Sequence, residues 1–261
     1  MAADDHFDSV LALSLKTGTV KWAHKTVNYD ASTLACVLTP PAKWCPSPSG
    51  PDYDFGSGPN LFTARSPATG KPETLVGIGQ KSGIYWALNP VNGHVVWSVR
   101  TGPGSRSGGS LWGSATDGTR IYVQEGNASH ISFVLKGGGP EAGKTCTGGA
   151  WSALSPATGQ ILWQVCDPHG NADTGALSVA DGVVYAGSMA KTAGVASMYA
   201  LNAATGAILW SFATGGEVNS GPAIVAGTVY WGSGYGTFGV GPADKNLYAF
   251  TVGTALSFLG G

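Results

Sequence analysis

Charged side chains are scarce in this chain of 261 residues, where Asp, Glu, Lys and Arg together make up 11%. The usual share in globular proteins is about 25%. The formal net charge is −1, and the sequence contains neither a basic stripe nor a block of like charges. Binding to nucleic acid or to an anionic membrane surface needs concentrated positive charge. The sequence therefore predicts neither a nucleic-acid partner nor a membrane partner.

Long apolar runs are also missing. No stretch reaches the ~18 apolar residues that a membrane-spanning helix needs. The first residues, MAADDHFDSV, are acidic and contain no apolar h-region, so we expect no signal peptide there. The composition therefore predicts a chain without a membrane span.

Cysteine is limited to four residues, and none of them stands in CxxC or CxxCH spacing. This argues against a zinc ribbon and against a c-type haem. Cys36 and Cys45 flank a proline-rich loop and are candidates for a disulfide, as are Cys146 and Cys166. The spacing alone does not decide whether each pair forms a disulfide or remains as two free thiols. Disulfides favour an extracytoplasmic or secreted protein.

Glycine, by contrast, is plentiful, with 41 residues, and part of it belongs to an internal repeat. Each copy reads Ala-Leu, a polar turn, a glycine four places before a tryptophan, and an alternating apolar run. This pattern predicts a β-hairpin whose glycine supplies a positive φ, and whose tryptophan packs between neighbouring sheets. The four gapless copies are ALSLKTGTVKW ending at Trp22, ALNPVNGHVVW at Trp97, ALSPATGQILW at Trp163 and ALNAATGAILW at Trp210.

The repeat predicts an all-β fold, a β-propeller of four-stranded antiparallel blades. One blade reads as the strands ALSVA, GVVYAGS, SMYALNA and AILWSFA, over about residues 175–213. The alternative is a generic β-sandwich with tryptophan in its core, which four gapless copies of one pattern make improbable. We treat residues 1–261 as a single propeller domain.

The ends of the chain leave the number of blades open. The chain starts with the third and fourth strands of a blade and closes with the first three strands of another, around three whole blades. Either a ring of about five blades closes irregularly, or the chain is part of an eight-bladed ring, which we favour. Open sheet edges invite pairing with other strands, so self-association of two copies is a further possibility.

Beyond the repeat, longer strings resemble the pyrroloquinoline quinone (PQQ) dehydrogenases, and most of all the branch similar to polyvinyl-alcohol dehydrogenase. They are FDSVLALSLKTG, PDYDFGSGP, GQKSGIYWALNPVNG, GGSLWGSATDGTRIY and GGAWSALSPATG. The resemblance implies an eight-bladed propeller of which this chain matches the C-terminal part. It also implies oxidation of secondary or polymeric alcohols by hydride transfer to PQQ, with Ca²⁺ as Lewis acid.

The resemblance also implies roles for particular residues. Asp8 stands at the position of the catalytic base and contributes to the metal site. The cofactor-binding candidates are Lys81, Asp52, Asp54, Trp112 and Trp151. Their simpler interpretations are turn residues for the three aspartates, a solvent-facing lysine and two packing tryptophans.

The Ca²⁺-ligating Glu and Asn of the family, its vicinal cysteine pair and one stacking tryptophan lie upstream of the position matched by Asp8. Ca²⁺ takes 6–8 oxygen ligands, so Asp8 alone is an incomplete site. The alternative function is a non-catalytic propeller that binds protein, peptide or glycan, because a fold does not fix a function. The substrate and the electron acceptor are not specified by the sequence.

Overall fold

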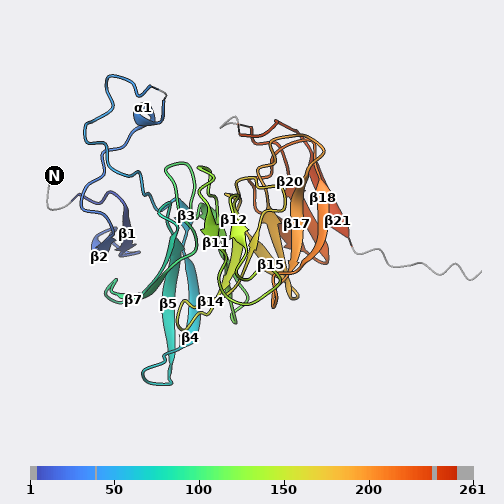
Figure 1. Cartoon of the computed structure of the whole chain (residues 1–261). Helices are drawn as coiled ribbons and strands as arrows, with labels where there is room; N and C mark the ends of the chain where they lie inside the picture. Colours follow the sequence, from blue (N-terminus) through green and yellow to red (C-terminus); the bar gives the residue numbers. More distant parts are fainter. Residues whose placement is uncertain (1–4, 39, 237–239, 252–261) are drawn as a thin grey trace, which may run out of the picture.

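The computed structural model describes residues 5–38, 40–236 and 240–251, and nearly all of their regular structure is antiparallel sheet (Figure 1). Three sheets have four strands, each in chain order. They are β4 (Asn60–Arg65), β5 (Pro72–Gly79), β6 (Ile84–Leu88) and β7 (Val95–Arg100); β9 (Ala115–Thr116), β10 (Ile121–Glu125), β13 (Ala150–Leu154) and β14 (Ile161–Cys166); β15 (Ser178–Ala180), β16 (Val183–Gly187), β17 (Ala196–Asn202) and β18 (Ile208–Ala213). The last of these confirms the blade predicted over 175–213.

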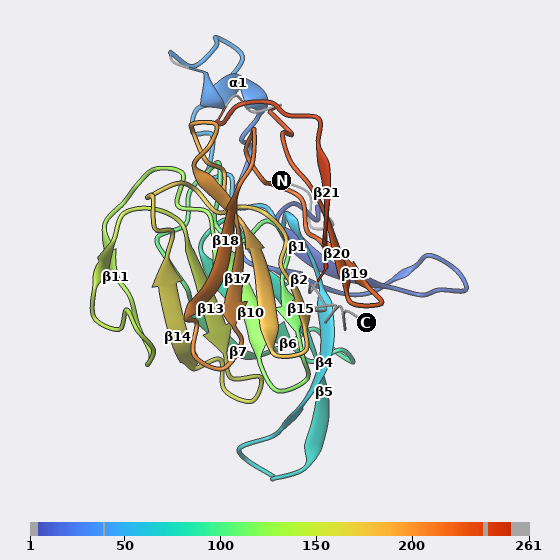
Figure 2. The ribbon, with the colours of Figure 1, turned by 90° about the vertical axis from the view of Figure 1, so that its right-hand side faces the viewer.

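The sheets at the two ends of the chain are smaller, in agreement with the partial blades predicted there from the sequence. The first contains β1 (Ser9–Leu13) and β2 (Val20–Lys25), and the last contains β19 (Ala223–Val225), β20 (Thr228–Gly232) and β21 (Leu247–Thr251). Within the described ranges, no strand of the first sheet pairs with a strand of the last. Figure 1 shows the sheets side by side in chain order from left to right, and Figure 2 views them along this row, so that they overlap.

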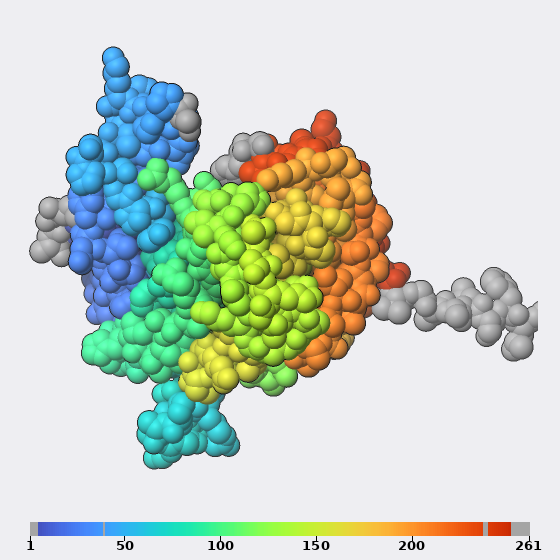
Figure 3. Space-filling model, in the orientation of Figure 1, coloured from blue at the N-terminus to red at the C-terminus, as the bar shows by residue number. Residues whose placement is uncertain are grey.

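One short helix and two short pairs of strands lie outside these sheets. They are the helix α1 (Leu34–Val37), a parallel pair of β3 (Ser57–Gly58) with β8 (Trp112–Gly113), and a pair of β11 (Phe133–Val134) with β12 (Thr145–Cys146). In the space-filling view, the loop that carries α1 stands out from the stack, away from the projecting turn between β4 and β5 (Figure 3). No helix in the described part of the chain is long and apolar enough to cross a membrane.

The stacking of the sheets explains why buried and exposed residues alternate along an outer strand. In β4, Phe62 and Ala64 are buried while Leu61 and Thr63 are exposed, because one face of this strand packs on the neighbouring blade. Every residue of the middle strands β10 and β13 is buried. The sheet that contains them lies between two other sheets and is covered on both faces.

At the first three junctions between blades, a tryptophan is docked on a glycine, as the repeat predicts. Each indole N–H donates to a carbonyl of the next blade at 2.9–3.0 Å, and a Cβ on the glycine would lie 2.4–2.7 Å from the ring. The glycines have φ of +72° to +77°, so they are required both for the turn and for the close approach. The pairs are Trp22 with Gly93, Trp97 with Gly159, and Trp163 with Gly206.

Both candidate disulfides are present. The bond between Cys36 and Cys45 closes the loop around α1. The bond between Cys146 and Cys166 connects β12 to β14 within a buried cluster that includes Leu135. The long loops that interrupt the repeat are therefore cross-linked to themselves or to a blade.

Candidate functional site

Four of the predicted site residues come together at one end of the first two sheets. Asp8 directly precedes β1, and Lys81 follows β5 by two residues. Asp52 and Asp54 belong to the segment that leads into β3. The Lys81 amide donates to the Asp54 carbonyl at 3.1 Å, which joins this segment to the end of β5.

Lys81 lies between the two aspartates of this segment. Its Nζ is 3.2 Å from Asp52 Oδ1 and 2.6 Å from Asp54 Oδ2. Burial alone would lower the pKa of Lys81, but the hydrogen bond to Asp54 and the negative charges of both aspartates outweigh it and raise that pKa. At Asp54, the effect of the Lys81 ammonium is larger than that of burial, and the pKa of Asp54 is lowered. At Asp52, the effect of burial is larger than that of Lys81, and the pKa of Asp52 is raised. The lysine is therefore held as a cation in a fixed position.

The environment of Asp8 differs from that of Asp52 and Asp54, because its charged neighbours are carboxylates and not a lysine. The residue is buried, and its Oδ2 has no hydrogen-bond partner among the described residues. Burial, followed by the hydrogen bonds and negative charges of Asp54 and Asp30, raises the pKa of Asp8 to about 7. A carboxylate with such a pKa can exchange a proton near neutral pH, which is the property of a general base.

Two members of this cluster were missed by the sequence analysis. Asp30 accepts the amides of Ser32 at 2.9 Å and of Tyr53 at 3.1 Å, so its carboxylate is fixed beside Asp8. An Asp followed by Ser two residues later is a common turn pattern, and it gave no reason to place Asp30 near Asp8.

Gln80 is the second missed residue and is only 1% exposed. Its Nε2 donates to Thr26 Oγ1 at 2.6 Å and to the Tyr53 carbonyl at 2.7 Å. Thr26 Oγ1 in turn donates to the Asp8 carbonyl at 3.2 Å. Gln80 therefore connects the backbone of Asp8 to the segment that carries Asp52 and Asp54.

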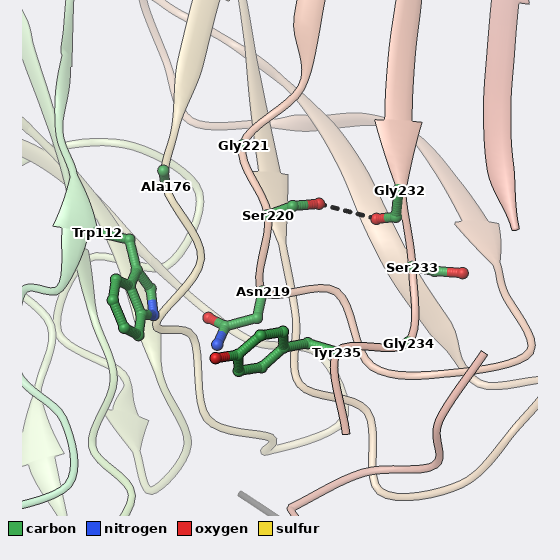
Figure 4. A pocket seen from close by; sticks show the side chains of 9 residues that line it. All are labelled: Trp112, Ala176, Asn219, Ser220, Gly221, Gly232, Ser233, Gly234 and Tyr235. Atoms are coloured by element: carbon green, nitrogen blue, oxygen red, sulfur yellow. Dashed lines mark hydrogen bonds between the residues drawn. The ribbon is translucent and has the colours of Figure 1, made fainter. Parts of the chain in front are cut away.

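Trp112 lies beside this cluster. Its amide donates to the Gly56 carbonyl at 3.0 Å, two residues after Asp54. The residue is 45% exposed, and its ring faces a cavity of about 470 Å³, with Tyr235 on the other side (Figure 4).

Trp151, in contrast, is fully buried in the sheet of β13, with its ring 5.0 Å from that of Tyr199. The structure therefore gives Trp151 a packing role. A cofactor contact for it stays a prediction, which we leave out of the proposed site.

The described residues fit a calcium-containing cofactor site only in part. The unpartnered Oδ2 of Asp8 is the kind of oxygen that Ca²⁺ binds. Among the residues that the structure describes, however, no group of three or more His, Cys, Asp or Glu side chains could hold a metal ion. The 6–8 oxygens that Ca²⁺ prefers are not assembled here, so we derive no step through the metal.

Glu125, at the end of β10, is a further buried carboxyl that the sequence did not single out. It is 0% exposed, its Oε1 accepts the Asn127 amide at 3.2 Å, and its Oε2 has no partner in the described structure. Burial raises its pKa from 4.5 to about 7. The folded protein therefore binds more protons than the unfolded chain between these pH values, and stability falls as the pH rises through this window.

We expect Glu125→Gln to raise the free energy of unfolding at pH 8, because an amide carries no charge to bury. The rise is up to about 3 kcal/mol, given about 1.4 kcal/mol per pKa unit. At pH 4.5 the variant and the parent should be nearly equal. Urea unfolding at both pH values measures this, with Glu73→Gln on β5 as the control. A gain that is the same at both pH values would contradict the assignment.

Comparisons with known proteins agree with this architecture. The family model described as outer membrane protein assembly factor BamB matches residues 147–256. Polyvinylalcohol dehydrogenase from Pseudomonas sp. is 33% identical over 251 residues, covering 87% of this chain and 36% of the relative. The enzyme of the same name from Sphingopyxis sp. (strain 113P3) is 32% identical over 267 residues, covering 88% and 36%. The chain thus spans little more than a third of the length of these curated relatives.

Solved structures show the same fold at lower identity. Quinohemoprotein alcohol dehydrogenase from Comamonas testosteroni matches with a TM-score of 0.57 and 18% identity, over 87% of this chain and 39% of that one. A europium-containing methanol dehydrogenase matches with a TM-score of 0.56 and 14% identity, over 87% and 45%. The predicted resemblance is confirmed: the chain is a β-propeller similar to part of the quinoprotein alcohol dehydrogenases, and in sequence to the polyvinyl-alcohol dehydrogenases.

Proposed function

We propose that this chain carries part of the active site of a PQQ-dependent dehydrogenase for secondary or polymeric alcohols. The observation that carries the proposal is the juxtaposition of Asp8, whose pKa is about 7, with a lysine held by two aspartates. The names of the curated relatives, polyvinylalcohol dehydrogenases, support the same activity. Because the chain covers 36% of their length, the activity of the whole protein is part of the proposal.

In the proposed mechanism each residue has a separate task. Asp8 accepts the hydroxyl proton of the alcohol on its unpartnered Oδ2. Lys81 stabilises negative charge that develops on an oxygen beside it, and Asp52 and Asp54 keep its ammonium in place. Bound PQQ would supply the electron-poor carbonyl carbon that accepts the hydride. A Ca²⁺ ion at this site would need additional oxygen ligands from outside the described residues, and we propose calcium dependence only on that condition.

Titration with PQQ, with and without Ca²⁺, tests the proposal. Ligand at 100 times its dissociation constant should stabilise the fold by about 2.7 kcal/mol, seen as a higher unfolding temperature. Lys81→Ala should remove most of this shift, since it removes the ammonium that is paired with Asp52 and Asp54. Lys71→Ala, in the exposed turn between β4 and β5, is the matched control. If PQQ causes no shift in either condition, the dehydrogenase proposal is wrong for this chain.

The alternative is a propeller that binds protein, peptide or glycan without catalysis. It is favoured by the incomplete set of oxygen ligands around Asp8 among the described residues. The propeller fold itself does not decide between the two functions. The absence of any PQQ effect in the titration would support this alternative.

We also propose an extracytoplasmic location. Within the described residues the structure contains two disulfides and no free cysteine. Stable disulfides are typical of oxidising compartments and rare in the cytosol. Loss of thermal stability in a reducing buffer would agree with this location, whereas full stability with both bonds reduced would weaken it.

A further inference from the structure

We propose that a divalent cation, Ca²⁺ in preference to Mg²⁺, binds to Asp167 and Asp173, where two neighbouring blades meet. Asp167 directly follows β14, and Asp173 lies in the segment that leads from β14 to β15. The pair shares no residue with the cluster of Asp8 and Lys81, and the inference does not depend on the proposed function. It can therefore be tested without any cofactor or substrate.

Asp173 is a buried carboxylate that the protein itself does not satisfy. Its exposed fraction is 0%, and neither Oδ1 nor Oδ2 has a hydrogen-bond partner among the described residues. The ion pairs in that part of the chain involve neither Asp173 nor Asp167. Burying a charge without a partner is strongly unfavourable, and an unsatisfied buried group in a native structure points to a bound water or ion.

Asp167 contributes a third oxygen of the same kind and is only 3% exposed. Its Oδ1 accepts the amides of His169 at 2.8 Å and of Asn171 at 2.9 Å, whereas its Oδ2 has no partner in the described structure. The Asp173 carboxyl lies close enough to interact with Asp167 and with Ser188, which directly follows β16. Two carboxylates cannot donate hydrogen bonds to each other, so three neighbouring oxygens remain without a donor.

Backbone contacts hold the two aspartates at this place. A Cβ on Gly149 would lie 2.5–2.8 Å from the N, Cβ and Cγ atoms of Asp173, so the close approach requires glycine. The Gly149 carbonyl accepts the Asp167 amide at 2.9 Å, and its amide donates to the Asn171 carbonyl at 2.6 Å. The Asp173 amide donates to the Gly126 carbonyl at 3.3 Å. The ends of β10, β13 and β14 therefore position both carboxyl groups.

A shared proton is the alternative occupant of this pair. Burial, followed by the negative charge of Asp167, raises the pKa of Asp173 well above its ordinary value, which favours a proton where no cation is bound. One proton, however, neutralises only one of the two charges and satisfies one oxygen of each carboxyl. The other Asp173 oxygen would still be buried without a partner. A divalent cation matches both charges and can bind all three oxygens.

The burial and the free oxygens of Asp173 favour Ca²⁺ over Mg²⁺. Both carboxylate oxygens are without a partner, which suits the bidentate binding that Ca²⁺ accepts. Mg²⁺ gives up its waters reluctantly, and this disfavours a carboxylate that is 0% exposed. With two acidic residues rather than three, the rest of the shell of 6–8 oxygens consists of neutral ligands such as Ser188 Oγ and water.

Terbium luminescence tests the site, because Tb³⁺ replaces Ca²⁺ on oxygen ligands and is excited through nearby aromatic rings. Tyr199 is close enough for the negative charges of Asp167 and Asp173, after burial, to raise its pKa, and its ring is 5.0 Å from that of Trp151. Asp173→Asn and Asp167→Asn should each lower the affinity for Tb³⁺ and for competing Ca²⁺ by at least about tenfold, since each removes one of two ligand charges. Asp181→Asn, at an exposed turn before β16, is the matched control. Mg²⁺ should compete at least about tenfold more weakly than Ca²⁺.

The unfolding temperature gives a second readout. Ca²⁺ in large excess over its dissociation constant should raise it by several degrees in the parent previously treated with EDTA, because the ion binds the folded chain. Asp173→Asn should lose this rise and yet be at least as stable as the parent in EDTA, because it removes one of two buried like charges. If Asp173 had only a packing role, the variant would be less stable in both conditions.

The proposal is wrong if Ca²⁺ neither stabilises the parent nor displaces Tb³⁺, which would assign the pair to a shared proton or to water. It is also wrong if Asp8→Asn removes the effect of Ca²⁺ while Asp173→Asn keeps it, since the ion would then belong to the cluster of Asp8 and Lys81. The first of these results needs only the parent protein, so it decides the question even where a variant does not fold.

Discussion

Asp8→Asn is expected to lower the rate at which bound PQQ is reduced by a secondary alcohol by about 10²–10⁴-fold, the usual contribution of a general base. The amide keeps the shape of the side chain but cannot take the proton. Asparagine also tolerates the left-handed backbone of this position, where φ is +44°. PQQ binding should change much less than the rate. Single-turnover absorbance of the quinone measures both quantities.

The pH dependence of the parent should agree with the same assignment. Asp8 acts as a base only when it is ionised, and its pKa is raised to about 7. The rate should therefore fall about tenfold per pH unit below pH 7 and level off above it. Asp181→Asn is the control, because Asp181 is exposed and has a similar φ of +47°. If Asp8→Asn and Asp181→Asn react at the same rate, Asp8 is not the base.

Short strings of sequence predicted those parts of the site that lie next to a strand. Asp8 and Lys81 flank β1 and β5, and Asp52 and Asp54 lie three to five residues before β3. Once the blades are stacked, strand ends of neighbouring sheets lie at one face, so these residues are brought together. The repeat predicts this stacking because it fixes both the hairpins and the tryptophans that connect them.

Asp30 and Gln80 could not be predicted in this way. Asp30 belongs to a loop without periodicity, and its position beside Asp8 depends on contacts with Ser32 and Tyr53. Gln80 reads as one more residue between a strand and a turn. Its role follows from hydrogen bonds to residues 27 and 54 positions away, which a sequence pattern does not show.

The cavity beside Trp112 was also beyond a sequence-based prediction. Tyr235 and Asn219 are more than 100 positions from Trp112, and the three meet only because their blades surround a common axis. The string around Trp112 predicts a cofactor-binding residue but not the partners of its ring. Trp151 shows the opposite case, in which a family string matched a residue that the structure buries completely.

Trp163→Ala is expected to lower the free energy of unfolding by about 3–5 kcal/mol, the cost of removing a large buried aromatic side chain. Trp163 is 1% exposed, covers Gly206, and donates to the Ala203 carbonyl at 3.0 Å. Its loss opens a cavity between two blades and leaves that carbonyl without the indole N–H. Urea unfolding of the parent and the variant measures the difference.

The repeat contains its own control for this prediction. Trp210 occupies the same place in its copy of the motif but is 38% exposed, and no contact of its ring with a glycine is present among the described residues. Trp210→Ala should therefore cost clearly less than Trp163→Ala. Gly206→Ala tests the other side of the contact, since its Cβ would lie 2.7 Å from the Trp163 ring on a backbone with φ of +77°. Equal costs for the two tryptophans would mean that docking on the glycine adds nothing to the stability of the stack.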